Sequence, residues 1–66
     1  MNIQVNGKSL EVIEPLTIVD LIKQLDYQNQ RIAIEINEAI IPKSNHAEFM
    51  ISDNDKIEII KAVGGG

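Results

Sequence analysis

The side chains of this 66-residue chain offer few groups that could carry out chemistry. His46 is the only histidine, and the absence of cysteine excludes a thiol nucleophile and a Cys-based zinc site. Asp53 and Asp55 flank a predicted turn but lack the further oxygen ligands of a calcium loop. The hydroxyl side chains have no base near them in the sequence that could activate them. We therefore expect no catalytic residues, no bound cofactor and no bound metal, and a surface or turn position for His46.

The remaining candidate is the main-chain carboxylate that follows Val63-Gly64-Gly65-Gly66. Glycine has no Cβ, so three glycines in a row form a segment thin enough to enter a narrow slot in a partner. Extended, this segment reaches about 10 Å at roughly 3.3 Å per residue. A carboxylate becomes reactive once ATP adenylates it, with a partner supplying orientation and charge stabilisation. The sequence thus predicts a group carrier whose reactive atoms lie on Gly66; the alternative is a frayed end without function.

Length and composition indicate one small, sheet-rich domain, predicted at residues 1–63, with residues 64–66 as a flexible tail. The chain contains thirteen isoleucines but only one Phe, one Tyr and no Trp. Because β-branched side chains favour strands, this composition indicates a sheet-rich domain. A formal net charge of −4 argues against nucleic-acid and anionic-membrane partners and would suit a partner with a basic docking surface. No apolar run could span a bilayer and no signal peptide begins the chain, so we expect a cytoplasmic protein.

The first half of the chain predicts a hairpin followed by a short helix. Apolar and polar residues alternate on both sides of Asn6-Gly7, a pair typical of a type I′ turn because both residues tolerate positive φ. Thr17 is the expected N-cap of the helix, with Asp20 in its first turn. The apolar face of this helix has the spacing i, i+3, i+4 and i+7 and consists of Ile18, Leu21, Ile22 and Leu25.

The second half predicts three more strands, at residues 32–37, 39–41 and 56–63. A helical turn within 44–48 and a polar turn at 52–55 separate the last two, and Phe49 and Ile51 are expected core contacts. The long connection allows the last strand to lie parallel to the first in the centre of the sheet. The fold class is therefore predicted as α+β, with a mixed sheet of four to five strands around one helix.

Side-chain alternation in the last strand predicts a docking surface beside the tail. Ile57 and Ile59 should face the helix, which leaves Ile60 and Ala62 on the opposite face of the sheet. These two side chains could be covered by another part of the fold, or they could form an exposed apolar patch together with Val63. We favour partner docking, because nothing in the sequence is expected to cover that face.

Over its whole length the chain resembles the ubiquitin-like sulfur carriers, and among them the ThiS-type carriers of thiamine biosynthesis. The order of the segments, the short length and the terminal glycines carry the resemblance together. The matching segments are Ile3-Gln4-Val5-Asn6-Gly7, Thr17-Ile18-Val19-Asp20-Leu21-Ile22, Ile32-Ala33-Ile34-Glu35-Ile36-Asn37, Ile41-Pro42-Lys43-Ser44, Asp53-Asn54-Asp55-Lys56-Ile57-Glu58-Ile59 and Val63-Gly64-Gly65-Gly66. Ala62 departs from the pattern where a larger apolar residue is common, and His46 where an aromatic residue is common.

The resemblance implies a β-grasp fold and a role as a protein substrate of enzymes. An E1-like enzyme of the ThiF type would use ATP and Mg²⁺ to adenylate Gly66, with Gly64 and Gly65 threading into its active site. Sulfur from a donor such as a cysteine desulfurase would give a thiocarboxylate, from which a ThiG-type thiazole synthase takes the sulfur. Two alternatives stay open, namely a carrier resembling the small subunit of molybdopterin synthase and a non-covalent β-grasp binding module.

Overall fold

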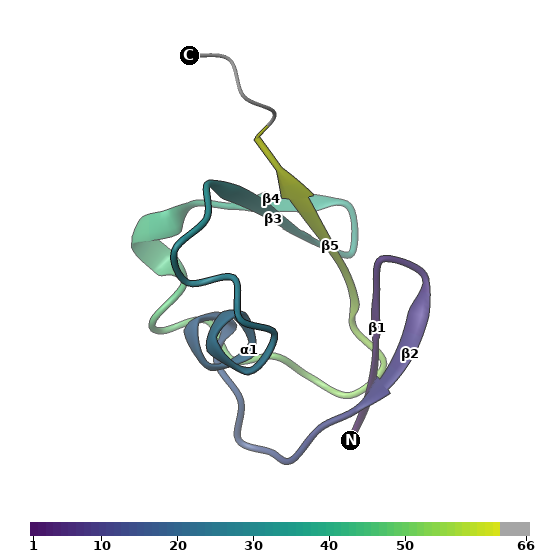
Figure 1. Cartoon of the computed structure of the whole chain (residues 1–66). Helices are drawn as coiled ribbons and strands as arrows, with labels where there is room; N and C mark the ends of the chain where they lie inside the picture. The colour runs from purple at the N-terminus through teal and green to yellow at the C-terminus, as the bar shows by residue number, and fades with distance from the viewer. Residues whose placement is uncertain (63–66) are drawn as a thin grey trace.

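The computed structural model describes residues 1–62, so the predicted docking residue Val63 and the tail 64–66 lie outside the described residues. The described part forms one five-stranded sheet that curves around helix α1 (Figure 1). In chain order the elements are β1 (Asn2–Val5), β2 (Lys8–Glu11), α1 (Ile18–Gln24), β3 (Ile32–Ile36), β4 (Ala39–Ile41), the 3₁₀ turn η1 (Lys43–Asn45) and β5 (Lys56–Lys61). The predicted order of strands and helix is confirmed.

The last strand lies in the centre of the sheet, whose strand order is β2-β1-β5-β3-β4. It runs parallel to β1, with Val5 opposite Ile57, and antiparallel to β3, with Ile34 opposite Ile59. The predicted mixed sheet and the parallel placement of the last strand are thus confirmed. Because β5 runs away from the N-terminal side, the described chain ends at the opposite end of the molecule from the N-terminus (Figure 1).

The hairpin turn also holds the central strand. Asn6 and Gly7 both have positive φ, at 51° and 83°, as a type I′ turn requires. The Asn6 N–H donates to the carbonyl of Ile57 at 2.9 Å, and the Asn6 side-chain oxygen accepts from the Ile59 N–H at 2.8 Å. The turn thereby continues the ladder to β5 beyond the end of β1.

Branched aliphatic side chains make up the core between α1 and the sheet. Ile57 and Ile59 face inward as predicted, and Phe49 and Ile51 contact the core, as also predicted. Within residues 1–62, the ten buried apolar residues are Ile3, Val12, Leu16, Ile18, Leu21, Ile34, Ile36, Ile51, Ile57 and Ile59. All ten lie between residues 3 and 59, before the end of β5.

A capping box begins α1. The Thr17 hydroxyl accepts from the Asp20 N–H, and the Asp20 carboxylate accepts from the Thr17 N–H, both at 3.1 Å. The backbone hydrogen bond from Thr17, followed by the Thr17 side chain, lowers the pKa of the Asp20 carboxyl from its usual 3.8. A carboxyl whose pKa falls on folding stabilises the protein above its unfolded pKa, and this contribution is lost as the pH falls through the folded value.

Thr17→Ala should lower the free energy of unfolding by about 1 kcal/mol, because the Asp20 N–H loses its acceptor in a helix of only seven residues. Urea denaturation at neutral pH measures the change, and most of the difference from wild type should persist at acidic pH, because the Asp20 N–H is not titratable and the variant keeps the main-chain N–H at position 17 that lowers the pKa of Asp20. Thr17→Ser keeps the hydroxyl and is the matched control. Equal midpoints for wild type and Thr17→Ala would contradict the stabilising role of the capping box.

Candidate functional site

The predicted docking residues that the structure describes lie at the end of β5. Ile60 is 46% exposed and Ala62 is exposed, so the expectation that these side chains point away from the core is confirmed. The Ala62 N–H donates to the carbonyl of Arg31 at 2.9 Å, which fixes the last described residue against the start of β3. Their role in docking stays a prediction, as do the roles of Val63 and of the glycines at 64–66, which lie outside the described residues.

Apolar side chains and one pair of acidic side chains lie near Ile60 on the outer face of the sheet. Ala33 lies opposite Ile60 in the β3–β5 ladder and is exposed, and Ile40 on β4 is 72% exposed. Glu35 lies opposite both Ile40 and Glu58. Like charges directly opposite each other on neighbouring strands disfavour the sheet, so this pair does not serve to stabilise the fold.

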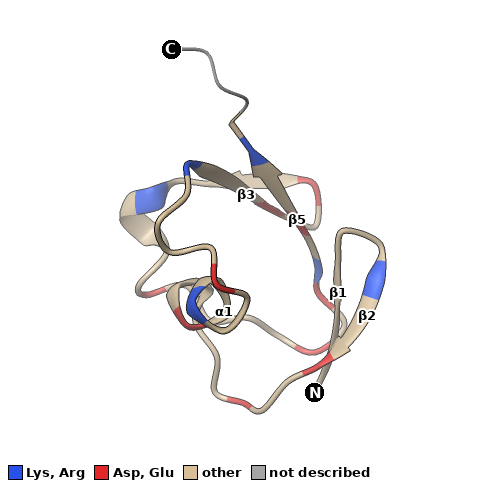
Figure 2. Cartoon of the chain, in the orientation of Figure 1, with Lys and Arg blue, Asp and Glu red and all other residues tan. Residues whose placement is uncertain are grey.

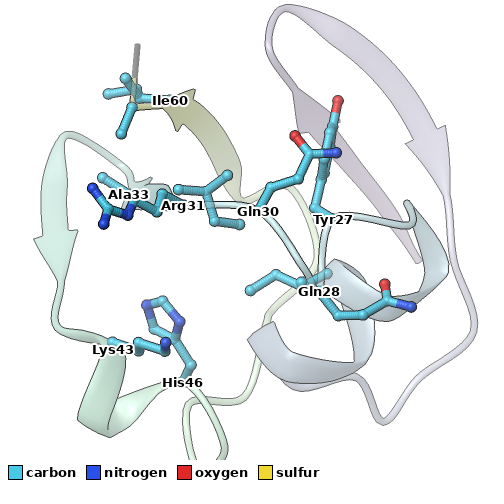
Figure 3. Close-up of a pocket in the computed structure, with 11 residues that line it drawn as sticks. Tyr27, Gln28, Gln30, Arg31, Ala33, Lys43, His46 and Ile60 are labelled. Carbon is cyan, nitrogen blue, oxygen red and sulfur yellow. The ribbon is translucent and has the colours of Figure 1, made fainter. Parts of the chain in front are cut away.

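A pocket of about 400 Å³ opens beside the end of β5, where β4 no longer covers β3 (Figure 3). β4 pairs only with Ile34, Glu35 and Ile36, which leaves the first residues of β3 without a neighbouring strand on that side. The pocket therefore contacts residues from both faces of the sheet, from the loop after α1 and from η1. Its lining residues are Ile22, Tyr27, Gln28, Gln30, Arg31, Ile32, Ala33, Lys43, His46, Ile60 and Ala62.

His46 is buried, with 5% of its surface exposed, so the predicted surface position was wrong, while the predicted turn position is correct. Its Nε2 lies 2.9 Å from the carbonyl of Ile41, which can only accept, so Nε2 carries the proton and donates. Its main-chain carbonyl accepts from the Val19 N–H at 3.2 Å. His46 thus connects the end of β4 to the start of α1, and it forms one wall of the pocket (Figure 3).

The pocket is cationic although the chain as a whole is acidic. Arg31 and Lys43 line it, and the Lys61 ammonium lies 5.1 Å from the ring centroid of Tyr27, another lining residue. No Asp or Glu is among the described lining residues. Sequence reasoning missed this site, because the basic residues are far apart in the chain and the net charge of −4 pointed to the opposite sign.

In residues 1–62, no group of three or more His, Cys, Asp or Glu side chains lies together so as to hold a metal ion. No helix in this part of the chain has the length and apolarity needed to cross a membrane. The exposed apolar patch and the neighbouring pocket make the end of β5 the candidate site.

A mixed five-stranded sheet that curves around one helix, with the final strand in its centre, places the protein in the β-grasp class. The family model described as the ThiS family matches residues 3–66. The chain belongs to the ThiS family. Both the predicted β-grasp fold and the resemblance to ThiS-type carriers are thereby confirmed.

Relatives of similar length support this assignment. The chain is 44% identical over 66 residues to the uncharacterized protein ycf40 of Porphyra purpurea, covering 100% of this chain and 93% of that protein. It is 37% identical over 65 residues to the sulfur carrier protein ThiS of Bacillus subtilis, covering 97% and 98% of the two chains. A crystal structure of the thiamine biosynthesis protein ThiS from Geobacter metallireducens matches with a TM-score of 0.86 and 29% identity over 100% of both chains.

A longer relative contains a similar segment. The thiazole synthase of Paramagnetospirillum magneticum is 33% identical to this chain over 66 residues. The match covers 100% of this chain but 20% of that protein. A segment similar to this chain is thus part of a protein named for thiazole synthesis.

His46→Ala should lower the free energy of unfolding by about 2 kcal/mol, since it removes a buried ring and the donor to the Ile41 carbonyl. His46→Phe keeps an aromatic ring and should lose only the part due to the hydrogen bond, about 1 kcal/mol. Urea denaturation measures both, with exposed Asn45→Ala as the control. A His46→Ala protein as stable as wild type would show that the buried ring does not hold β4 and α1 together.

Proposed function

We propose that this chain is a sulfur carrier of thiamine biosynthesis and that Gly66 carries the sulfur. The observation that carries the proposal is the position of the end of β5. The strand is fixed in the centre of the sheet, Ile60 near its end and Ala62 just after it are exposed, and the glycines follow Val63 in the sequence. Membership of the ThiS family supports the same role.

The chemistry takes place on the main-chain carboxylate, with the catalytic groups on partner proteins. An E1-like enzyme of the ThiF type binds ATP and Mg²⁺, and a carboxylate oxygen of Gly66 attacks the α-phosphorus, so that pyrophosphate leaves. A persulfide, relayed from a donor such as a cysteine desulfurase, then attacks the acyl carbon and displaces AMP, which gives an acyl disulfide with the donor. A thiol attacks the donor-side sulfur of this disulfide, so that a new disulfide forms there and the thiocarboxylate of Gly66 leaves. The carrier contributes a reactive group with little bulk around it, since Gly64 and Gly65 have no side chains.

The proposed acceptor of the sulfur is a ThiG-type thiazole synthase. The thiazole synthase of Paramagnetospirillum magneticum supports this partner, because it includes a segment similar to this chain within its own sequence. Joining a carrier to its acceptor raises the effective concentration of one for the other, which is useful when the two react repeatedly. For a separate carrier, docking must supply that proximity, and the exposed patch around Ile60 is our candidate for it.

Removing Gly66 should abolish activation, because the carboxylate then ends about 3.3 Å short of the adenylation site. Wild type incubated with a ThiF-type enzyme, ATP and Mg²⁺ should form an acyl-adenylate, and a sulfur source should then replace one oxygen by one sulfur, seen in the intact mass. The deletion variant should show neither change, yet its melting temperature should equal that of wild type, since the last buried apolar residue of the described chain is Ile59. Wild type whose mass stays unchanged, while a control carrier is activated, would favour a non-covalent binding module.

Ile60→Asp should weaken binding to the ThiF-type enzyme about tenfold or more, because it puts a charge into an apolar contact. The free energy of unfolding should fall by no more than about 1 kcal/mol, since the side chain is half exposed. Isothermal titration measures the first quantity and urea denaturation the second. Ile60→Val should behave as wild type, whereas Ile59→Asp should unfold the protein. Global unfolding by Ile60→Asp would mean that Ile60 has a structural role.

A further inference from the structure

Basic side chains are concentrated at the end of the molecule where β5 ends. Three of the six Lys and Arg residues lie here: Arg31 directly before β3, Lys43 at the start of η1 and Lys61 at the end of β5. Figure 2 shows these blue segments around the end of β5. The acidic turn at 52–55 lies near the N-terminus instead, where Asp53 accepts a hydrogen bond from the Asn2 N–H at 2.7 Å. The rim of the pocket at Arg31 and Lys43 is therefore positive on a chain that is negative overall, whereas the acidic pair Glu35 and Glu58 lies on the outer face outside the lining of the pocket.

The pocket also offers backbone groups at an open strand edge. The carbonyl of Arg31 accepts a hydrogen bond from the Ala62 N–H, so the main-chain polar groups of Arg31 point toward the end of β5. In an antiparallel ladder the next residue directs its N–H and C=O to the other side, so those of Ile32 point away from β5. The pairing of β4 stops at Ile34, so no described strand residue lies opposite Ile32 on that side. Ile32 lines the pocket, which therefore has a main-chain donor and acceptor at its edge.

These features fit an extended protein segment better than a nucleotide. Proteins usually hold phosphates with backbone N–H groups from a glycine-rich loop or a helix N-terminus. No glycine lines this pocket within the described residues, and the first turn of α1 is capped by Thr17 and Asp20 of the same helix. An extended acidic segment could bond to the edge at Ile32, place an apolar side chain against Ile22 and Ile60, and pair its carboxylates with the basic rim.

We propose that this pocket, with Arg31 and Lys43 at its rim, is the docking site for an acidic segment of the activating enzyme. The inference rests on the proposed function, since it assigns a surface to the enzyme that acts on Gly66. Docking here brings the partner to the point where the chain leaves β5, because Ala62 lines the pocket and is four residues from the C-terminus. The local positive charge orients the carrier with this end toward an acidic partner surface, which speeds productive encounter.

The double charge reversal Arg31→Glu/Lys43→Glu tests the proposal against a matched control, Lys8→Glu/Lys56→Glu. Both doubles change the net charge equally, and all four side chains are exposed. Isothermal titration with a ThiF-type enzyme should give a Kd at least about tenfold weaker for the pocket double than for the control double, with a smaller salt dependence. Adenylate formation by the pocket double should show a raised KM with kcat little changed, since Gly66 is intact.

The outcomes separate this inference from the proposed function. Wild type adenylated at Gly66, with equal Kd values for the two doubles, overturns the docking site and leaves the function standing. Binding that depends on Arg31 and Lys43 without any change in the mass of wild type supports the docking site and overturns the function. No binding of wild type overturns both. Titration of ATP alone onto the isolated carrier, followed by NMR, should leave the pocket resonances unmoved; shifts that vanish in the pocket double would assign the pocket to a nucleotide instead.

Discussion

The candidate site depends on the fixing of β5 in the centre of the sheet. This strand is paired on both sides, parallel to β1 and antiparallel to β3, and its residue Ile57 is completely buried. Asn6 adds hydrogen bonds to Ile57 and Ile59 at the point where β1 has ended. A central strand cannot shift its register without turning its buried side chains outward, so the position of Ile60 and Ala62 is set by the core. The residues beyond them therefore start from a fixed point on the surface.

Because side chains alternate along this strand, one of its faces is buried and the other is exposed. Ile57 and Ile59 pack on the helix, whereas Glu58 and Ile60 face outward. The outward residues contribute little to the core, and the opposed carboxylates of Glu35 and Glu58 even disfavour the sheet. A surface that is apolar and unfavourably charged in the free protein is better suited to contact with another molecule than to stability. This reading is consistent with a protein whose function is to be recognised by its partners.

Local patterns in the sequence predicted most of the fold. Alternation around Asn6-Gly7 identified the hairpin, and the Thr17 cap with its apolar spacing identified α1, since each signal lies within a few residues. The exposure of Ile60 was predicted from the alternation of side chains between the two faces of one strand. The pocket could not be predicted in this way, because it depends on where β4 stops relative to β3 and brings together Arg31 and Lys43. The burial of His46 was missed for the same reason, since its partner, the Ile41 carbonyl, becomes close only after the chain turns at η1.

A carrier that visits more than one partner needs contacts that form fast and also release. Exposed ion pairs contribute little to affinity, about 0–1 kcal/mol each, but they raise the rate of encounter and fix the orientation of docking. A small apolar patch on a 66-residue domain limits the total affinity as well. If the proposed docking is correct, the basic rim of the pocket and the apolar face around Ile60 combine fast, oriented binding with a short-lived complex. Net charge alone would repel an acidic partner, so in that case the uneven distribution of charge, rather than its sum, sets which end of this protein the partner meets.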